Sequence, residues 1–386
     1  MRILIVYDCL FPHTIGGAER WYRSLAERLA DAGHDVTYVT LRQWERGERP
    51  EVPGVRIVSA GPRMALYGAG GRRRIAPPLV FGAGVLAHLL RHGRSYDVVH
   101  TASFPYFSLL AAGLLRRAAH YRLVVDWHEL WSREYWRAYL GPLGGRIGWA
   151  VQRAGLRRRQ RAFCFAELTA ARLRAERVRG PVEVLPGEYA GSLETPRPLP
   201  ARDEVVFAGR HIAAKRVPAL VEAFAALRER APELRLAIYG DGPEHAAVLA
   251  RIGALGLGDV ARAPGFVGAD ELEDALAHAL CMVLPSQREG YGLVVVEAAA
   301  RGVPSIVVRH PDNAATELVD DGQNGFVAAS PGPEDLAEAI LRVRAAGPQL
   351  RADTAAWFAR NARRLSLQRS LDRVVAVYEG DASARS

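Results

Sequence analysis

The sequence predicts an α/β protein built from two doubly wound domains that face a cleft. The chain has 386 residues, which is more than one hydrophobic core usually organises, so two domains are expected. Short apolar runs alternate with helical stretches, a pattern typical of parallel sheets covered by helices on both faces. The alternation pauses at a Pro- and Gly-rich stretch, "PGEYAGSLETPRPLPAR", and then begins again.

The first half of the chain begins with a buried-strand run, "RILIVYD", followed by "GGAERWYRSLAERLADAGH", which has helical periodicity and a glycine stop at Gly33. Further strands are expected at "DVTYVT", "GVRIVSA", "YDVVHT", "YRLVVDWH", "AFCFAE" and "VEVLP". We therefore predict a first domain over residues 1–186 and a linker over 187–203.

The second half repeats this order of elements. Strands are expected at "EVVFAGR", "LRLAIYGDGP", "CMVLPS" and "VPSIVV", and helices at "VPALVEAFAALRERAP", "LVVVEAAARG" and "DLAEAILRVRAA". We predict a second domain over 204–365 and a terminal helix over 366–386 that packs back toward the first domain. Ligands of such domains bind at the carboxyl ends of the strands.

Composition narrows the class of protein. A hydrophobic content of 49% and a charged content of 24% are ordinary for a globular chain. The N-terminal apolar run is interrupted at Asp8, too early for a signal peptide, and the longest apolar runs are too short to span a bilayer. The three cysteines are widely spaced and lie in or beside apolar runs, which favours buried thiols in a reducing compartment: Cys9, Cys164 and Cys281. We expect a cytoplasmic protein.

The net charge of +9 is concentrated in the first half, where residues 141–180 contain ten arginines and two glutamates. There, "RIGWAVQRAGLRRRQR" (146–161) places Ile147, Trp149, Val151, Ala154 and Leu156 among arginines, as a basic amphipathic helix would. A second cluster, "GGRRRIAPP", spans 70–78. A solvated face is the default interpretation, and peripheral docking to an anionic inner membrane face is the alternative. Nucleic acid is not expected, since no binding motif accompanies the charge.

The stretch "FAGRHIAAKRVP" contains the single lysine of the chain, Lys215, against fifty arginines. Arginine replaces lysine easily where only charge is needed, so the remaining lysine indicates a place where a compact ammonium group is required. Arg210 lies five residues earlier on the same strand-to-helix loop. Together the two cations suit a diphosphate, and chance in an arginine-rich chain is the alternative.

A second landmark is "PSQREGYGLVVVEAAARGVP", where Glu289 precedes a glycine turn and Glu297 lies eight residues on, inside a helix. The glycines let backbone N–H groups approach a ligand at the start of the helix. Glu289 could accept hydrogen bonds from sugar hydroxyls and Glu297 could hold ribose hydroxyls. The alternative is a capping carboxylate and a surface glutamate.

These motifs resemble the retaining glycosyltransferases of family 4, which have the two-domain GT-B fold. "EGYGLVVVE" is similar to the E-x7-E element of that family, "GRHIAAK" to its diphosphate-binding Arg and Lys, and "GGAER" to its N-terminal glycine loop. The resemblance covers the chain from Arg2 to about Tyr378, and it implies that the domain of residues 1–186 binds the acceptor and that the domain of residues 204–365 binds the nucleotide sugar. Two stretches depart from the family pattern, "LPGEYAG" after the last strand of the first domain and "RHPDNAATELV" after "VPSIVV".

The resemblance assigns roles to individual residues. Arg210 and Lys215 would neutralise the leaving diphosphate, Glu289 would contact the sugar, and His128 in "VVDWHEL" would face the donor sugar from the first domain. His100 is a further candidate on the acceptor side. The remaining donor-binding positions that it implies are Gly16, Gly17, Phe266, Val267, Gly290, Tyr291, Gly292, Leu293 and Glu297.

The implied activity is transfer of a hexose-like sugar from a nucleoside diphosphate to an acceptor hydroxyl, with anomeric retention. The acceptor would be a glycan or a lipid-linked molecule. No D-x-D pair is present, so a metal-independent reaction without a cofactor is expected. The alternatives are a nucleotide-sugar epimerase, a phosphorylase, or a non-catalytic protein that binds a nucleotide or a lipid. A dehydrogenase is poorly supported, because "YDCLFPHTIGG" lacks the G-x-G-x-x-G spacing.

Overall fold

The computed structural model describes residues 1–14, 16–45, 47–48, 50–66, 68 and 73–383. The described chain divides into two compact units. Unit 1 contains the described residues of 1–68, 73–186 and 370–383, and unit 2 contains residues 187–369. The chain therefore passes from unit 1 to unit 2 and returns to unit 1 for its last helix.

Unit 1 is built on a seven-stranded sheet in the order β3-β2-β1-β4-β5-β6-β7, and every strand pair in it is parallel. The central strands read as continuous apolar runs because both of their faces are covered. The strands are β1 (Arg2–Val6), β2 (Asp35–Thr40), β3 (Val55–Ser59), β4 (Val98–Ala102), β5 (Arg122–Trp127), β6 (Arg161–Cys164) and β7 (Val182–Val184).

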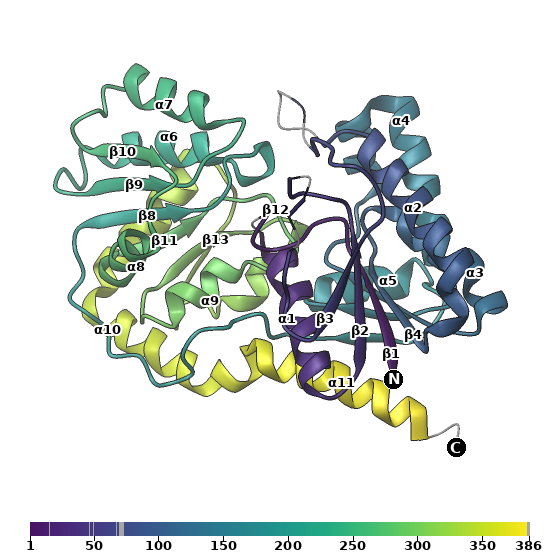
Figure 1. The fold of residues 1–386 in the computed structure, drawn as a ribbon. Helices are drawn as coiled ribbons and strands as arrows, with labels where there is room; N and C mark the ends of the chain where they lie inside the picture. The colour runs from purple at the N-terminus through teal and green to yellow at the C-terminus, as the bar shows by residue number, and fades with distance from the viewer. Residues whose placement is uncertain (15, 46, 49, 67, 69–72, 384–386) are drawn as a thin grey trace. The chain divides into compact units, whose positions relative to one another are not determined.

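The helices of unit 1 cover both faces of this sheet. Figure 1 shows α2, α3 and α4 on one side of the strands and α1 and α11 on the other. The helices are α1 (Gly17–Asp31), α2 (Ala76–His92), the short 3-10 helix η1 (Gly93–Ser95), α3 (Tyr106–Ala119), α4 (Arg133–Leu156), α5 (Glu167–Ala175) and α11 (Leu367–Ser383).

Helix α4 differs from the amphipathic pattern expected of residues 146–161. It kinks at Gly141, where φ is 77°, and it ends at Leu156. Its buried face contains the small residues Gly145, Gly148 and Gly155. A Cβ at Gly148 would lie 2.3 Å from the Trp136 ring, so this face has no room for a larger side chain there. Close packing on this face turns Ile147 outward, where 58% of the residue is exposed.

Unit 2 contains a six-stranded parallel sheet in the order β10-β9-β8-β11-β13-β15 and a separate two-stranded sheet of β12 and β14. The strands of the larger sheet are β8 (Glu204–Ala208), β9 (Arg235–Tyr239), β10 (Ala261–Gly265), β11 (Cys281–Leu284), β13 (Ser305–Val308) and β15 (Gly325–Ala328). The small sheet pairs β12 (Arg288–Glu289) with β14 (Asp312–Asn313).

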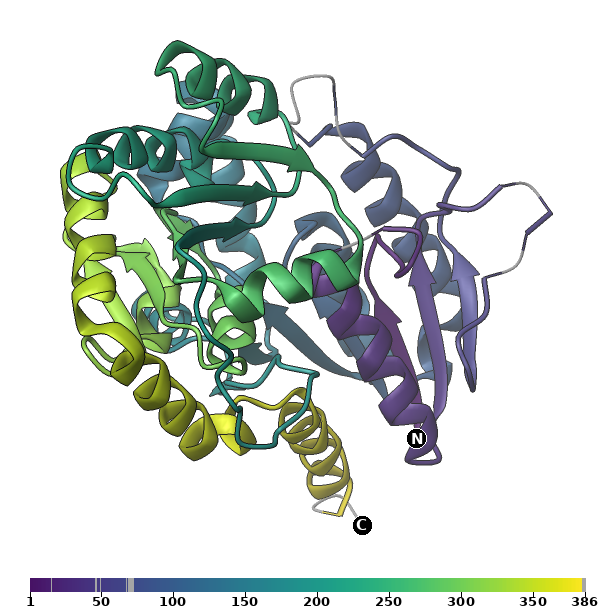
Figure 2. The ribbon, with the colours of Figure 1, turned by 90° about the vertical axis from the view of Figure 1, so that its left-hand side faces the viewer.

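The helices of unit 2 include one long element, α10, which bends at Gly347, where φ is 61°. The bend is visible in Figure 2. The helices are η2 (Ala213–Lys215), α6 (Val217–Leu227), α7 (His245–Ala254), α8 (Ala269–His278), α9 (Leu293–Ala299), η3 (Ala314–Leu318) and α10 (Pro333–Leu365).

Residues 187–203, expected as a linker, form no helix and no strand. Tyr189 anchors the start of this segment, since its N–H donates to the Leu365 carbonyl at 3.0 Å and its carbonyl accepts from the Leu367 N–H at 2.8 Å. The two passages of the chain between the units are therefore tied together at Tyr189.

Two further expectations concern the chain as a whole. All three cysteines are buried. None of the helices in the described part of the chain combines the length and the apolar character that crossing a bilayer requires.

Candidate functional site

The carboxyl edge of the unit 2 sheet brings together two loops that carry predicted residues. β8 ends at Ala208, and the chain continues through Arg210 to Lys215 at the end of η2. β11 ends at Leu284 and is followed by β12 with Glu289. Because β8 and β11 are parallel neighbours, both loops leave the sheet at the same edge.

Lys215 and Glu289 form an ion pair in which the Lys215 Nζ donates to Glu289 Oε1. The pair is well shielded, with 21% of the lysine side chain and 9% of the glutamate side chain exposed. The Gln287 N–H donates to the Ala214 carbonyl at 3.0 Å and joins the same two loops through the backbone. The structure thus places the single lysine against the first glutamate of the E-x7-E element.

Asn313 holds the Glu289 loop in place, and sequence reasoning did not assign it a role. It lies opposite Glu289 in the β12–β14 pair and is 1% exposed. Its Nδ2 donates to the carbonyls of Ser286 at 3.1 Å and Val308 at 2.8 Å, and its Oδ1 accepts from the Ala315 N–H at 3.0 Å. The sequence signal was an asparagine directly before a helical turn, a common capping position.

The glycine turn after Glu289 has the geometry that only glycine adopts without strain. Gly292 has φ 102° and precedes α9, and a Cβ there would lie 2.7 Å from the Ala315 Cβ. Tyr291 before it is buried, Gly290 and Leu293 are half-buried, and Glu297 lies half-buried in α9. The E-x7-E element therefore spans the turn and the helix as the sequence indicated.

The other donor-site candidates of unit 2 lie on loops at the same edge of the sheet. Arg210 is exposed on the loop that leads to Lys215. Phe266, which is 77% exposed, and the half-buried Val267 follow β10, which β9 separates from β8. Phe266 presents an apolar ring to its surroundings.

A histidine pair involves the loop after β8 that also carries Lys215, and it was not found from the sequence. His211 is fully buried, and its Nδ1 lies 3.1 Å from the Nδ1 of His245 at the start of α7. Burial and the neighbouring His245 lower the pKa of His211. The pair joins the loop after β8 to the loop after β9, which supports the backbone that carries Arg210.

In unit 1 the predicted residues lie at the carboxyl edge of its own sheet. Gly16 is the N-cap of α1, and Gly17 is the first residue of that helix. A Cβ at Gly16 would lie 2.3 Å from the Glu19 carboxylate, whereas one at Gly17 would meet open space. His128 follows the end of β5, which β4 separates from β1.

Asp126, two residues before His128, is the centre of a buried hydrogen-bond network. Its Oδ2 accepts from the Trp21 Nε1 at 2.7 Å and its Oδ1 from the His100 Nε2 at 2.7 Å. With the proton of His100 on Nε2, Nδ1 is free to accept from the Tyr378 hydroxyl at 2.6 Å. His100, Asp126 and Tyr378 are at most 1% exposed. The structure therefore gives His100 a structural role and not the acceptor-side role considered above.

His128 lies in an aromatic enclosure. Its ring stacks on Phe165 with centroids 4.7 Å apart and an interplanar angle of 4°, and it meets Tyr22 at 6.1 Å edge to face. Its Nε2 is buried without a hydrogen-bond partner. Burial lowers its pKa, the Asp126 carboxylate raises it, and His100 lowers it further, with a net decrease. The imidazole is therefore neutral near pH 7.

We expect His128 to titrate below pH 6.5, the ordinary value for histidine. Because its pKa is lower in the folded state, the unfolded state binds more protons as pH falls through about 6.5, and unit 1 loses stability in that range. Histidine NMR spectra recorded from pH 8 to 5 would show the titration midpoint, and a His128→Gln variant would assign the resonance. A midpoint at or above 6.5 would contradict the burial argument.

Within the residues that the structure describes, no three histidine, cysteine, aspartate or glutamate side chains are grouped so as to hold a metal ion.

Family models match almost the entire described chain. A model of group 1 glycosyl transferases matches residues 197–364, and a model of glycosyltransferase family 4 matches residues 15–187. Each model coincides with one of the two units.

Individual relatives are similar over part of the chain. The α-D-kanosaminyltransferase of Streptomyces kanamyceticus is 32% identical over 145 residues, which cover 38% of this chain and 37% of the relative. A D-inositol 3-phosphate glycosyltransferase of Nocardiopsis dassonvillei is 32% identical over 198 residues, 49% of this chain and 46% of the relative. The matches thus span less than half of the length of these relatives.

Solved structures share the fold over the full length. Sucrose-phosphate synthase from Thermosynechococcus elongatus has a TM-score of 0.80 at 21% identity and covers 100% of both chains. The Anabaena protein HepE, solved in complex with UDP, has a TM-score of 0.72 at 17% identity and covers 98% of this chain and 100% of its own. These likenesses establish the GT-B fold.

Proposed function

Because this chain belongs to the family 4 glycosyltransferases, we propose that it transfers a sugar from a nucleoside diphosphate donor to an acceptor hydroxyl with retention of anomeric configuration. The observation that carries the proposal is the shielded Lys215–Glu289 pair at the carboxyl edge of the unit 2 sheet. A binding protein has no need of a carboxylate beside its phosphate-binding cation, whereas sugar transfer uses both charges.

The reaction separates two charges, and each member of the pair suits one of them. The leaving diphosphate gains negative charge, which the Lys215 ammonium and the Arg210 guanidinium would stabilise without a metal ion. The sugar gains positive charge at the anomeric carbon, which the Glu289 carboxylate would stabilise while it accepts hydrogen bonds from sugar hydroxyls. In the free protein the two side chains neutralise each other, so neither charge is left unpaired before the donor binds.

The remaining candidates hold the donor. The proposal assigns the ribose to Glu297, the base to Phe266 and Val267, and the phosphates to backbone amides of the turn formed by Gly290, Tyr291, Gly292 and Leu293. For unit 1 it retains His128 as a neutral hydrogen-bonding contact to the donor sugar and the N-cap region at Gly16 and Gly17 as a contact to donor or acceptor.

Donor binding gives the first test. UDP, GDP and ADP, each alone and sugar-linked, are added to the protein and its melting temperature is measured; UDP comes first because HepE was solved with it. A nucleotide present at about 100 times its Kd stabilises the protein by about 2.7 kcal/mol. We expect one base to act selectively and Lys215→Ala to weaken its effect. No response to any nucleotide would contradict the proposal.

Product analysis separates transfer from its alternatives. The labelled donor is incubated without an acceptor. An epimerase would convert its sugar to an epimer, and a phosphorylase would form a sugar phosphate when phosphate is added, whereas a transferase would form neither compound. Anomeric retention is read from the NMR coupling constant of the new glycosidic bond. Turnover that EDTA abolished and Mg²⁺ restored would contradict the metal-independent assignment of Arg210 and Lys215.

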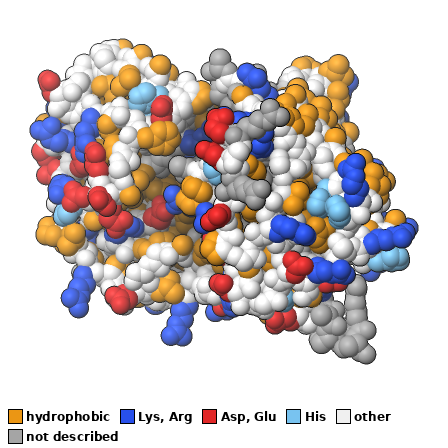
Figure 3. All heavy atoms as spheres, viewed as in Figure 1, with side chains coloured by type: hydrophobic (Ala, Val, Ile, Leu, Met, Phe, Trp, Pro, Cys, Tyr) orange, Lys and Arg blue, Asp and Glu red, His pale blue; other side chains and the backbone are white. Residues whose placement is uncertain are grey.

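We propose further that α4 docks unit 1 on an anionic membrane where a lipid-linked acceptor lies. Leu143 and Ile147, one helical turn apart, are 71% and 58% exposed, and Arg146 and Arg153 are exposed on the same helix. Figure 3 shows hydrophobic side chains gathered at the upper right of the viewed face, over α4. Apolar and cationic groups together are typical of a helix that lies in a membrane interface.

Vesicle binding tests this docking. The paired change Leu143→Gln and Ile147→Gln should reduce co-sedimentation with vesicles that contain phosphatidylglycerol by at least about tenfold, because each apolar side chain contributes about 1.5–3 kcal/mol when buried. High salt should weaken binding of the unchanged protein. Leu249→Gln, at a 47% exposed site on α7 of unit 2, is the matched control. Binding that ignores both salt and anionic lipid would rule the idea out.

A further inference from the structure

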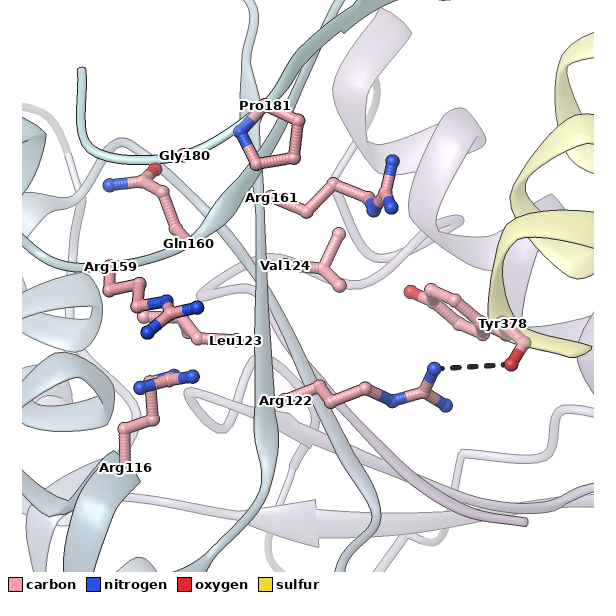
Figure 4. Close-up of a pocket in the computed structure, with 10 residues that line it drawn as sticks. All are labelled: Arg116, Arg122, Leu123, Val124, Arg159, Gln160, Arg161, Gly180, Pro181 and Tyr378. Atoms are coloured by element: carbon pink, nitrogen blue, oxygen red, sulfur yellow. Dashed lines mark hydrogen bonds between the residues drawn. The ribbon is translucent and has the colours of Figure 1, made fainter. Parts of the chain in front are cut away.

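An arginine-lined cavity lies at the amino edge of the unit 1 sheet, at the opposite end of the strands from His128 (Figure 4). Its volume is about 260 Å³. β5 begins with Arg122 and ends at Trp127, so the cavity and His128 are separated by about 16 Å of strand. The cavity is lined by Arg116, Arg122, Leu123, Val124, Arg159, Gln160, Arg161, Gly180, Pro181 and Tyr378.

Four of the ten lining residues are arginines and none is acidic. Figure 4 shows Arg116 and Arg159 on one side of β5, and Arg122 and Arg161 on the side where Tyr378 lies. They come from the last turn of α3, the first residue of β5, the loop before β6 and the first residue of β6. Guanidinium groups gathered in this way repel one another, and an anion that sits among them removes the repulsion.

Two of these arginines are held in place by the protein. Arg122 donates to the Tyr378 carbonyl at 3.1 Å, and its guanidinium carbon lies 5.9 Å from the centroid of the Tyr378 ring. Arg161 lies 3.5 Å from a Glu183 carboxylate oxygen, so one nearby carboxylate balances part of the charge from outside the lining. These contacts keep both side chains on the Tyr378 side of β5, where they contribute positive charge near the cavity.

The part of the cavity wall that Gly180 and Gln160 form is also rigid. Gly180 has φ 139°, and a Cβ there would lie 1.7 Å from the Gln160 carbonyl oxygen. The Gln160 side chain accepts from the Trp127 Nε1 at 2.8 Å and donates to the Gly155 carbonyl at 2.9 Å. The shape of the cavity is therefore set by close backbone contacts and buried hydrogen bonds.

We propose that this cavity is a second anion site, which binds a phosphate-bearing molecule through Arg116 and Arg159 on one side of β5, while Arg122 and Arg161 on the other side add to its positive potential. The planar guanidinium fork matches phosphate oxygens in pairs, and the volume admits more than a single phosphate group. The phosphate belongs either to a small soluble molecule or to a lipid headgroup. This site is independent of the donor site proposed in unit 2.

Calorimetric titration with sodium pyrophosphate tests the proposal on the full chain. The unchanged protein should bind at two sites, one in each unit. The double variant Arg116→Gln, Arg159→Gln should weaken one of them by at least about tenfold, since each removes hydrogen bonds to a charged group. Lys215→Ala should weaken the other. Arg117→Gln, at the exposed neighbour of Arg116 on α3, is the matched control and should bind as the unchanged protein does.

Pyrophosphate binding that is the same in the double variant and in the unchanged protein would overturn the proposal. If Lys215→Ala alone had no effect, the donor assignment would fail and the cavity would stand. A second arm identifies the source of the phosphate. Loss of binding to phosphatidic acid vesicles in the double variant indicates a lipid headgroup, and binding of pyrophosphate without any vesicle binding indicates a soluble ligand; both support the site.

Discussion

Replacing Lys215 with alanine is expected to lower the turnover number for the proposed sugar transfer by about two orders of magnitude or more. Loss of one preorganised group that stabilises transition-state charge costs on the order of 3 kcal/mol, and we propose that role for Lys215, which forms an ion pair with Glu289. Turnover is measured with saturating donor, so that weaker donor binding does not enter the comparison. Arg235→Ala, at an exposed arginine on the amino edge of the same sheet, is expected to leave turnover unchanged.

Lys215→Arg is the sharper variant, because it keeps the positive charge and changes only its shape. The ammonium group lies between two loops and beside a carboxylate that is 9% exposed, where the larger planar guanidinium does not fit in the same position. A displaced group at the reacting centre can cost about a hundredfold in rate. We therefore expect Lys215→Arg to be impaired as well, and full activity in this variant would refute the inference drawn from the single lysine.

Folding has to be separated from chemistry in these variants. Lys215→Ala leaves the Glu289 carboxylate buried without its ion-pair partner, which destabilises unit 2 in its own right. The double variant Lys215→Ala, Glu289→Gln removes that unpaired charge. Recovered stability with turnover still lost indicates that the Lys215–Glu289 pair acts in the reaction, whereas recovery of both would show that the pair acts only through the fold.

The second large effect is expected at Asp126, where alanine should destabilise unit 1 by about 3–5 kcal/mol. The fully buried carboxylate accepts from Trp21 and His100, so its removal leaves two buried N–H donors without partners. His100 then loses the contact that fixes its tautomer, and the hydrogen bond from Tyr378 weakens with it. The change therefore loosens α1, α11 and the centre of the sheet together.

Hydrogen exchange measured peptide by peptide shows where the stability is lost. Amides of β4 and β5 should lose about a hundredfold or more of their protection, while β8 and β11 of unit 2 serve as the internal reference. Asp97→Ala removes an exposed carboxylate that accepts only from the Arg2 N–H, so it is the matched control. Equal protection of β4 in the two variants would contradict the role given to Asp126.

The Asp126 carboxylate also makes the folding stability of unit 1 decrease at low pH. Burial alone raises its pKa, but the electrostatic interaction and the hydrogen bond with His100 outweigh this, and the pKa lies below its ordinary value of 3.8. A lowered carboxylate pKa adds stability that is complete above about pH 4 and is lost as pH falls through the folded-state value.

The sequence predicted every strand of the unit 1 sheet and the central strands of the unit 2 sheet, but it missed the edge strands of unit 2 and the small sheet, for a physical reason. Strands such as β4 and β11 are covered on both faces and therefore read as apolar runs. β10 contains Pro264 and arginine, which an edge strand tolerates, and the sequence analysis singled out only Phe266 and Val267 just after it, as donor-binding positions. β12 and β14 have two residues each, which is too short for any periodicity to appear.

The candidate site was partly predictable because some of its residues are unusual in composition. A single lysine, and two glutamates around a glycine turn, are recognisable in the amino-acid sequence itself. Lys215 and Glu289 are 74 residues apart, and their contact depends on β8 and β11 being neighbours in the sheet. The order of strands in a sheet cannot be predicted from the local hydrophobic periodicity of each strand. The bond from Tyr378 to His100 spans 278 residues and joins two side chains that carry no motif.

The return of the chain to unit 1 has a consequence for the order in which the protein is made. Residues 187–369 leave the ribosome before α11 does. At a rate of about 5–20 residues per second, synthesis of these residues takes on the order of ten seconds or more. During that interval the sheet of unit 1 lacks the helix whose Val374 and Tyr378 complete its core. All six strands of the unit 2 sheet are by then available. We therefore expect the half of the protein that is encoded second to finish folding first.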